Sequence, residues 1–373
     1  MMNNELENPI LPKKQESKRL IALDAARGLA VIGMYIQHFA LNQINSFVSG
    51  NTMILFMLCS GISYSIMVQR MTERKVEPSV FRARMLARAV FIDLVGYVLI
   101  MLNGPFGVVL PAYAMLFILA LVLIRRSTRA LVTMSGVLFL VGPPLMLLGL
   151  SLFSGAYLLS DIAGGPLSAL GWAPVFVAGM AIGRLNLRNT RTALRFIATG
   201  FAILIPFKLI ASFVLPGVCQ SFETWLIQFP SITNPQADPY AIWPLNTQQP
   251  PWQTLFVAAP QCGSTFELLI GTGLSLIILG LMCLIAKKST AILKPFSAVG
   301  RVALTLYTVQ FVIAWGLQIA GIDVTSVDIG GIPFGDILVA AVILIAGCLL
   351  ASLPNGPLES LIRRFERMFS NIQ

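Results

Sequence analysis

Three ionisable residues, Asp24, Arg27 and His38, lie in the first strongly apolar stretch of the chain, and His38 is the only histidine in the sequence. At about 100° per residue, the step from Arg27 to His38 returns to within about 20° of the same helix face. Asp24 falls within about 40° of His38 by the same period. A helix over this stretch therefore places all three on one face, with Arg27 and His38 about 16 Å apart along its axis.

This arrangement is suited to acid–base or nucleophilic chemistry at His38 beside an anion site at Arg27. Imidazole titrates near neutrality, so it can act as a general base or accept a group covalently. A guanidinium binds phosphate or carboxylate, and Asp24 is placed to orient it. The structural alternative is an interfacial Asp24–Arg27 ion pair with His38 as an interhelical hydrogen-bond donor.

Two further cations lie in apolar stretches. Arg301 and Thr305 share one face of a predicted helix at 299–319, with Tyr307 turned elsewhere, and they could hold a phosphate; snorkelling of Arg301 to the interface is the alternative. Lys208 lies near the middle of another apolar stretch and needs an anionic partner, either Asp93 or a substrate.

The composition determines which class of protein positions these residues. Of 373 residues, 56% are hydrophobic and 11% charged, whereas soluble domains have about 25% charged residues. An ordinary soluble enzyme and a disordered chain are therefore excluded, and we expect an all-α polytopic membrane protein with about ten transmembrane helices. The predicted spans lie near 25–44, 52–69, 88–103, 108–124, 131–151, 167–183, 196–215, 265–286, 299–319 and 336–353.

The charges predict how these helices are oriented. The sequence has 26 Lys and Arg residues against 16 Asp and Glu, and the cations cluster between alternate predicted spans, on the side of both termini. The positive-inside rule makes this side cytoplasmic. We expect a cytoplasmic N-terminal tail at 1–20, a transmembrane domain at 21–354 and a cytoplasmic C-terminal tail at 355–373. Because orientation accounts for the basic clusters, no nucleic-acid partner is expected.

One long extracytoplasmic loop is predicted at 216–264, and Cys219 and Cys262 flank it. Because this side is oxidising, we expect a disulfide between them that closes the loop. Trp243 and Glu223 belong to a set of aromatic and acidic loop residues that could stack on sugar rings and bind hydroxyls. With Lys208 they are the candidate substrate-binding residues; an aromatic belt at the membrane interface is the alternative.

Three motifs resemble known membrane acyltransferases. RLIALDAARGLAVIGMYIQHFA (19–40), LFMLCSGISYSI (55–66) and GRVALTLYTVQ (300–310) look like the heparan-alpha-glucosaminide N-acetyltransferase-like proteins with a YeiB-like (DUF418) C-terminal domain. The spacing of Arg27 and His38 is similar to the signature of the acyltransferase-3 membrane acyltransferases, which modify bacterial envelope glycans. Leu306 departs from the pattern, because many YeiB-like sequences have Asn there, and many have Asn rather than His near position 38.

The resemblance implies an enzyme of the bacterial cytoplasmic membrane. It would move an acyl group, expected to be acetyl, from cytoplasmic acyl-CoA to a hydroxyl or amine of an extracytoplasmic envelope glycan or glycolipid. His38 would be catalytic with Arg27 and Asp24, either as the acylated residue or as the general base. The phosphates of CoA would lie near Arg27, Arg301 and Thr305.

A transporter or flippase of an anionic or lipid-linked solute is the alternative function, with Arg27, Lys208 and Arg301 as its sites. Inverted repeats would favour it, and the sequence has no second copy of the Asp24, Arg27 and His38 pattern. The expected partners are the lipid bilayer, acyl-CoA and the glycan or glycolipid acceptor, and a homodimer is compatible with the sequence. No metal is expected, because one histidine and scattered cysteines lack ligand spacing.

Overall fold

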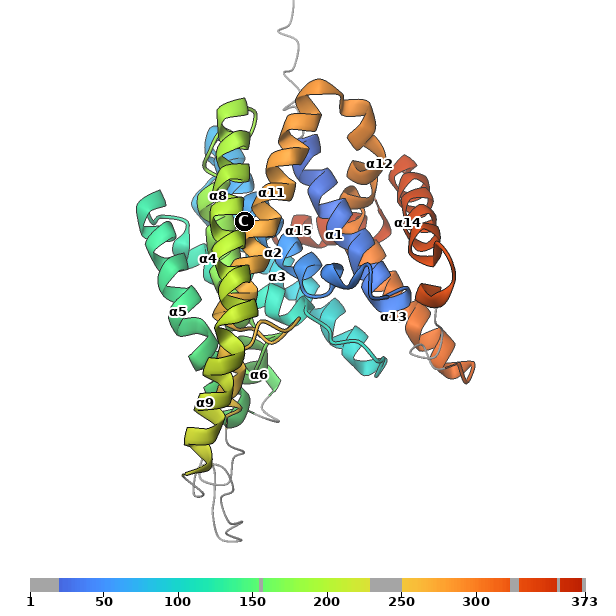
Figure 1. Ribbon diagram of the computed structural model, residues 1–373. Coiled ribbons are helices and arrows are strands. Elements are labelled where there is room, and N and C mark those ends of the chain that lie inside the picture. The colour runs from blue at the N-terminus through green and yellow to red at the C-terminus, as the bar shows by residue number, and fades with distance from the viewer. Residues whose placement is uncertain (1–19, 154–156, 229–249, 323–328, 354–355, 371–373) are drawn as a thin grey trace, which may run out of the picture.

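The computed structural model describes residues 20–153, 157–228, 250–322, 329–353 and 356–370. Within these ranges the chain forms helices and no strand, which confirms the all-α class. Long helices run along the height of the molecule in Figure 1, while α15 lies crosswise to them. The helices that coincide with predicted spans are α1 (Ile21–Phe39), α2 (Asn51–Glu73), α3 (Pro78–Met101), α4 (Leu110–Leu123), α5 (Thr128–Leu152), α7 (Ala169–Ile182), α8 (Thr190–Phe213), α11 (Thr265–Lys288), α12 (Thr290–Arg301) with α13 (Ala303–Ile319), and α14 (Gly335–Ser352).

Shorter elements complete the described chain. They are η1 (Ser46–Val48), α6 (Tyr157–Ala163), α9 (Leu215–Ile227), η2 (Trp252–Phe256), η4 (Ile329–Gly331) and α15 (Pro357–Ser370). The last of these lies in the segment that the sequence predicts as a tail, and it packs against α3. The C-terminal segment is therefore part of the folded structure.

Several helices have the length and composition of membrane spans. Within the described residues five helices meet these criteria, or six if α12 and α13 count as one bent span. The chain is thus a multi-pass membrane protein. Helices α4 and α7 are apolar but shorter, with 14 residues each, and the total of ten spans remains a prediction.

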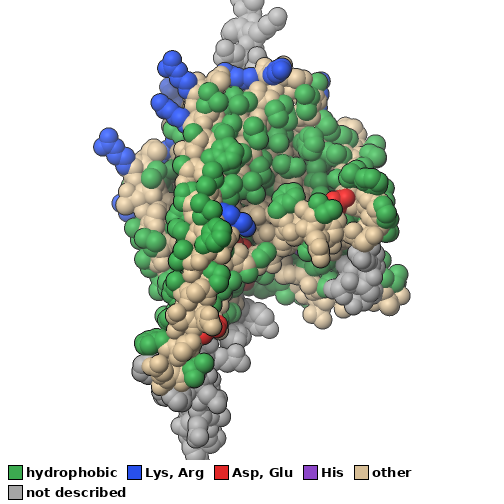
Figure 2. All heavy atoms as spheres, in the orientation of Figure 1, with side chains coloured by type: hydrophobic (Ala, Val, Ile, Leu, Met, Phe, Trp, Pro, Cys, Tyr) green, Lys and Arg blue, Asp and Glu red, His purple; other side chains and the backbone are tan. Residues whose placement is uncertain are grey.

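Charged side chains are segregated along the molecule. Figure 2 shows Lys and Arg side chains gathered at one end, above a broad band of apolar side chains. Helix α8 contributes to this band, since only 11% of its most apolar window is buried within the protein. An apolar helix this exposed is expected to face lipid hydrocarbon.

Glycines bring the N-terminal and C-terminal halves together. A Cβ atom at Gly28 of α1 would lie 1.9 Å from the carbonyl oxygen of Phe296, and one at Gly300 of α12 would lie 1.8 Å from that of Asp24. Such small residues allow two membrane helices to approach at backbone distance. The contact places the first turns of α1, with Arg27, against the end of α12.

The predicted helix at 299–319 is not continuous. Helix α12 ends at Arg301, α13 begins at Ala303, and the two axes are bent by 63°. The ninth predicted span is therefore wrong as a single straight helix, and the face predicted to join Arg301 and Thr305 does not exist.

Candidate functional site

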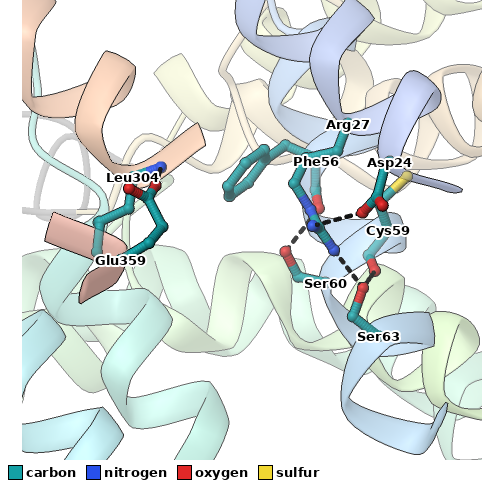
Figure 3. Close-up of polar contacts among 8 residues, drawn as sticks. All are labelled: Asp24, Arg27, Phe56, Cys59, Ser60, Ser63, Leu304 and Glu359. Atoms are coloured by element: carbon teal, nitrogen blue, oxygen red, sulfur yellow. Dashed lines mark hydrogen bonds and ion pairs between the residues drawn. The ribbon is translucent and has the colours of Figure 1, made fainter. Parts of the chain in front are cut away.

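Arg27 is held by polar partners from two helices. Its Nη1 lies 3.5 Å from Oδ1 of Asp24, one turn earlier in α1, and its Nη2 donates a hydrogen bond to Oγ of Ser63 in α2. Figure 3 shows Ser60 beside the same guanidinium. Asp24 is buried, so the two charges offset each other in an apolar interior. The ion pair between Asp24 and Arg27 is present, as both the orienting role of Asp24 and the structural alternative expect.

Arg27 lines a cavity of about 250 Å³ that we call the basic cavity. Three further arginines line it: Arg88 of α3, Arg301 at the end of α12 and Arg363 of α15. Of these three further arginines, Arg88 alone has an acidic partner among the described residues: its Nε lies 2.5 Å from Oε1 of Glu366. A cavity with this many guanidinium groups is suited to bind phosphate or carboxylate groups.

Thr305 does not line the basic cavity with Arg301. Its backbone N–H and its hydroxyl donate to the carboxylate of Glu359 in α15, at 3.1 and 2.6 Å, and Leu304 N–H donates to it at 2.9 Å. Figure 3 shows Glu359 at Leu304, the start of α13. The break at Val302 therefore separates Arg301 from Thr305, which bonds to Glu359. Glu359 itself lines the basic cavity together with Arg301.

His38 lines a second cavity, of about 270 Å³, that we call the His38 cavity. Its ring stacks on Phe106, with ring centroids 3.9 Å apart and planes 7° apart, and meets Phe311 edge-on. The Nδ1 atom is buried without a hydrogen-bond partner among the described residues. The ring also lies close enough to Gln310 of α13 to interact with its amide, so the structure agrees with the interhelical alternative as well as with a catalytic imidazole.

Tyr307 of α13 lines both cavities. Its hydroxyl accepts a hydrogen bond from Val109 N–H at 3.1 Å. Val109 lines the His38 cavity and the next residue, Leu110, lines the basic cavity. The contact between Tyr307 and Val109 thus separates the two spaces. The helical period turns Tyr307 away from the predicted site because it assumes an unbroken helix through Val302.

Gln310 is another residue that sequence reasoning misses. Its side chain has no exposed surface, and neither amide atom has a hydrogen-bond partner within the described chain. It lies one turn of α13 beyond Tyr307 and interacts with His38. The sequence does contain a signal for Gln310, because it is a polar residue inside an apolar stretch that also contains Tyr307.

The predicted substrate-binding residues do not converge. Lys208 is exposed on α8, whereas Oδ1 of Asp93 on α3 is buried without a hydrogen-bond partner among the described residues. The nearby Asp161 accepts a 2.5 Å hydrogen bond from Tyr97. Of the two partners expected for Lys208, Asp93 is not the one that the described structure provides: α8 packs against α11, whereas α3 packs against α4 and α15. Glu223 is exposed on α9. Trp243 lies outside the described residues.

The predicted disulfide between Cys219 and Cys262 is absent, because both thiols are free. The local packing gives each sulfur another neighbour. Cys219 Sγ lies 3.9 Å from the carbonyl oxygen of Gln253, and Cys262 Sγ lies 3.5 Å from that of Val257.

Comparison with known families supports one of the resemblances. Residues 239–368 match the family described as "Protein of unknown function (DUF418)". This range includes Arg301, Tyr307, Glu359 and Arg363, so both cavities contain residues from it. Comparison with curated proteins finds no match, and the similarity to the acyltransferase-3 group remains a prediction. The C-terminal part of the chain, residues 239–368, is thus similar to the DUF418 family.

Proposed function

We propose that the protein is a membrane acyltransferase. It moves an acyl group, expected to be acetyl, from cytoplasmic acyl-CoA to a hydroxyl or amine of an extracytoplasmic envelope glycan or glycolipid. The observation that carries the proposal is that Arg27 and His38, on one helix, line two cavities that meet at Tyr307. An anion site and an imidazole therefore lie on the two sides of Tyr307 in the interior of a membrane protein.

The basic cavity is the donor site in this proposal. CoA carries several phosphates, and Arg27, Arg301 and Arg363 offer guanidinium groups for them. The cavity is too small for all of CoA, so the arginines would hold its phosphates at the opening while the thioester arm enters towards Tyr307. Asp24 and Ser63 fix the Arg27 guanidinium before the donor arrives.

The His38 cavity is the transfer site. In one route His38 attacks the thioester carbonyl, the C–S bond breaks as a C–N bond forms, and CoA leaves as a thiolate that takes up a proton; the acceptor oxygen or nitrogen then displaces the imidazole. In the other route His38 removes the acceptor's proton while the acceptor attacks the thioester carbonyl directly; the C–S bond breaks, and the CoA thiolate leaves and takes up a proton. Stacking on Phe106 fixes the ring plane in both routes.

The proposed topology has ten spans, cytoplasmic termini and a location in the bacterial cytoplasmic membrane. Its support is the segregation of Lys and Arg to one end of the molecule (Figure 2). Arg27 then lies towards the cytoplasm and His38 towards the opposite face, which is the direction that acyl transfer requires.

Sealed inside-out membrane vesicles supplied with acyl-labelled acetyl-CoA test the proposal. We expect the label to appear in lipid or glycan extracted from vesicles with the wild-type protein, and not from vesicles with His38→Ala. Equal labelling by His38→Ala would contradict the role of His38. Movement of an anionic amphiphile across the vesicle membrane without acyl labelling would support the transporter alternative instead.

A further inference from the structure

Lys208 is a cation on a surface that otherwise suits lipid. It lies on α8, where Leu204, Ile205 and Leu209 surround it, and its side chain is exposed. None of the described side chains forms a hydrogen bond or ion pair with it. An ammonium group facing hydrocarbon is costly unless it meets an anion or water. The position therefore calls for a partner from outside the described chain.

Lys208 also lines a cavity of about 500 Å³ between α8, α11 and the turn that joins α1 to α2. Leu209, Ile270 and Leu274 form its apolar walls with Phe47. The other polar residue, Asn51, uses its amide to donate to the carbonyl oxygen of Phe47 at 2.7 Å. An apolar cavity with one cation matches an amphiphile with hydrocarbon and a negative headgroup.

The cavity lies away from the basic end of the molecule. Lys208 is about 20 Å beyond Arg195 along α8. Phe47 and Asn51 follow the end of α1 that carries His38, not the end that carries Arg27. In the proposed topology Lys208 lies on the outer side of the span centre, about 8 Å along α8 before its end at Phe213. Its long side chain can extend from there towards the phosphate headgroups of the outer leaflet.

The Lys208 cavity and the His38 cavity share a wall. Asn51 lines the first, whereas the next two residues, Thr52 and Met53, line the second. The first turn of α2 therefore separates a cation that can hold a lipid phosphate from the imidazole. A headgroup attached to that phosphate needs to pass only this turn to reach the His38 cavity.

We infer that the Lys208 cavity binds an anionic membrane lipid, with its phosphate on the Lys208 ammonium and its chains along Leu204, Leu209 and Leu274. Resting on the proposed function, the acceptor of the acyl group is then a phosphate-bearing, lipid-linked glycan that enters sideways from the outer leaflet. The lipid site itself does not depend on the acyltransferase activity.

Photo-crosslinking in nanodiscs tests the lipid site. The full-length protein is placed in phosphatidylcholine discs that contain a trace of photoreactive phosphatidylglycerol, and crosslinked peptides are mapped. We expect crosslinks over residues 204–209 and 270–274, reduced about fivefold by Lys208→Met and retained by Lys208→Arg. Lys294→Gln, which removes an exposed cation at the basic end, should leave them unchanged. Photoreactive phosphatidylcholine should give about fivefold fewer crosslinks at these peptides.

Equal crosslinking by the two lipids, or unchanged crosslinking in Lys208→Met, would overturn the inference. Methionine is apolar and compatible with a lipid-facing helix, so Lys208→Met should fold. Lys208→Arg keeps the positive charge and tests whether the charge is required for crosslinking. Measuring acyl transfer on the same samples separates the two proposals. If crosslinking follows Lys208 but wild-type protein transfers no acyl group, the lipid site stands and the proposed function fails. If acyl transfer requires His38, while Lys208→Met changes neither the crosslinking nor the acyl transfer, the proposed function stands and the lipid site fails.

Discussion

At the scale of residues, one helix supplies both ends of the proposed reaction path. Arg27 is fixed by Asp24 and Ser63, while His38 is fixed by stacking on Phe106 and has an unpartnered Nδ1 within the described structure. These environments differ in kind. The first stabilises a permanent cation, and the second holds an imidazole in place without using that nitrogen.

Arg27→Gln should weaken the binding of acyl-CoA. Loss of one charge-assisted contact to a phosphate corresponds to about a tenfold rise in the KM for acetyl-CoA, with a smaller change in kcat. Initial rates in vesicles over a range of acetyl-CoA concentrations measure this. Arg191→Gln removes an exposed arginine that does not line the basic cavity and should behave as wild type. An unchanged KM in Arg27→Gln would remove Arg27 from the donor site.

Cys262 should react slowly with maleimide and faster as the pH rises. Burial, with the nearby Glu267 carboxylate, raises the pKa of the Cys262 thiol to about 11. The thiolate is the reactive form, so at pH 8 labelling should be roughly a hundredfold slower than that of glutathione. The rate should increase about tenfold per pH unit below the pKa. Mass spectrometry of labelled peptides without reductant measures it; labelling that requires reductant would instead show a disulfide with Cys219.

At the scale of elements, the start of α13 is stabilised from a distant part of the sequence. The amides of Leu304 and Thr305 would be unpaired at a helix N-terminus. Glu359 of α15 accepts hydrogen bonds from both, and its negative charge is favourable at this end of the helix dipole. The docking of α15 therefore maintains the break that leaves Arg301 in the basic cavity.

Glu359→Ala should destabilise the protein by about 1–2 kcal/mol, because it removes the cap of α13. Glu359→Gln keeps an acceptor oxygen and should cost less. Thermal unfolding midpoints in detergent compare the stability of the two variants with that of wild type. Glu73→Ala, which changes an exposed carboxylate at the end of α2, serves as control. A midpoint for Glu359→Ala equal to that of the control would show that α15 does not cap α13.

Gly300→Ala should separate α1 from α12, because its Cβ would lie 1.8 Å from the carbonyl oxygen of Asp24. We expect a loss of about 1–3 kcal/mol. Gly136→Ala is the matched control: no atom lies within 4 Å of its added Cβ, and alanine is the better helix former. In thermal unfolding in detergent, Gly300→Ala should have a lower midpoint than wild type, whereas Gly136→Ala should not. Equal midpoints for the two variants would contradict the close contact between α1 and α12.

Helix positions could be predicted from the sequence, whereas the break between α12 and α13 could not. Apolar length identifies a span, and helical periodicity correctly places Asp24 and Arg27 together because α1 is unbroken there. The same period fails for Arg301 and Thr305. The contact that fixes their separation comes from Glu359, more than fifty residues later, and no local pattern shows it.

At the scale of the whole molecule, two cavities lie in series between a basic end and the opposite end. The part of the chain that is similar to DUF418 supplies Arg301 and Tyr307, and the N-terminal helices supply Arg27 and His38. Charge clusters could be read from the sequence because they are local. The meeting of the cavities at Tyr307, and the absence of a Lys208–Asp93 pair, depend on which helices pack together, and one sequence does not determine that packing.

The central claim is that His38 transfers an acyl group to a component of the cell envelope. Mass spectrometry of envelope glycans and glycolipids tests it most directly, in cells that lack this gene and are complemented with wild type or His38→Ala. We expect an acyl mass that is present with wild type and absent with His38→Ala at equal protein levels. Unchanged envelope masses, or full restoration by His38→Ala, would contradict it.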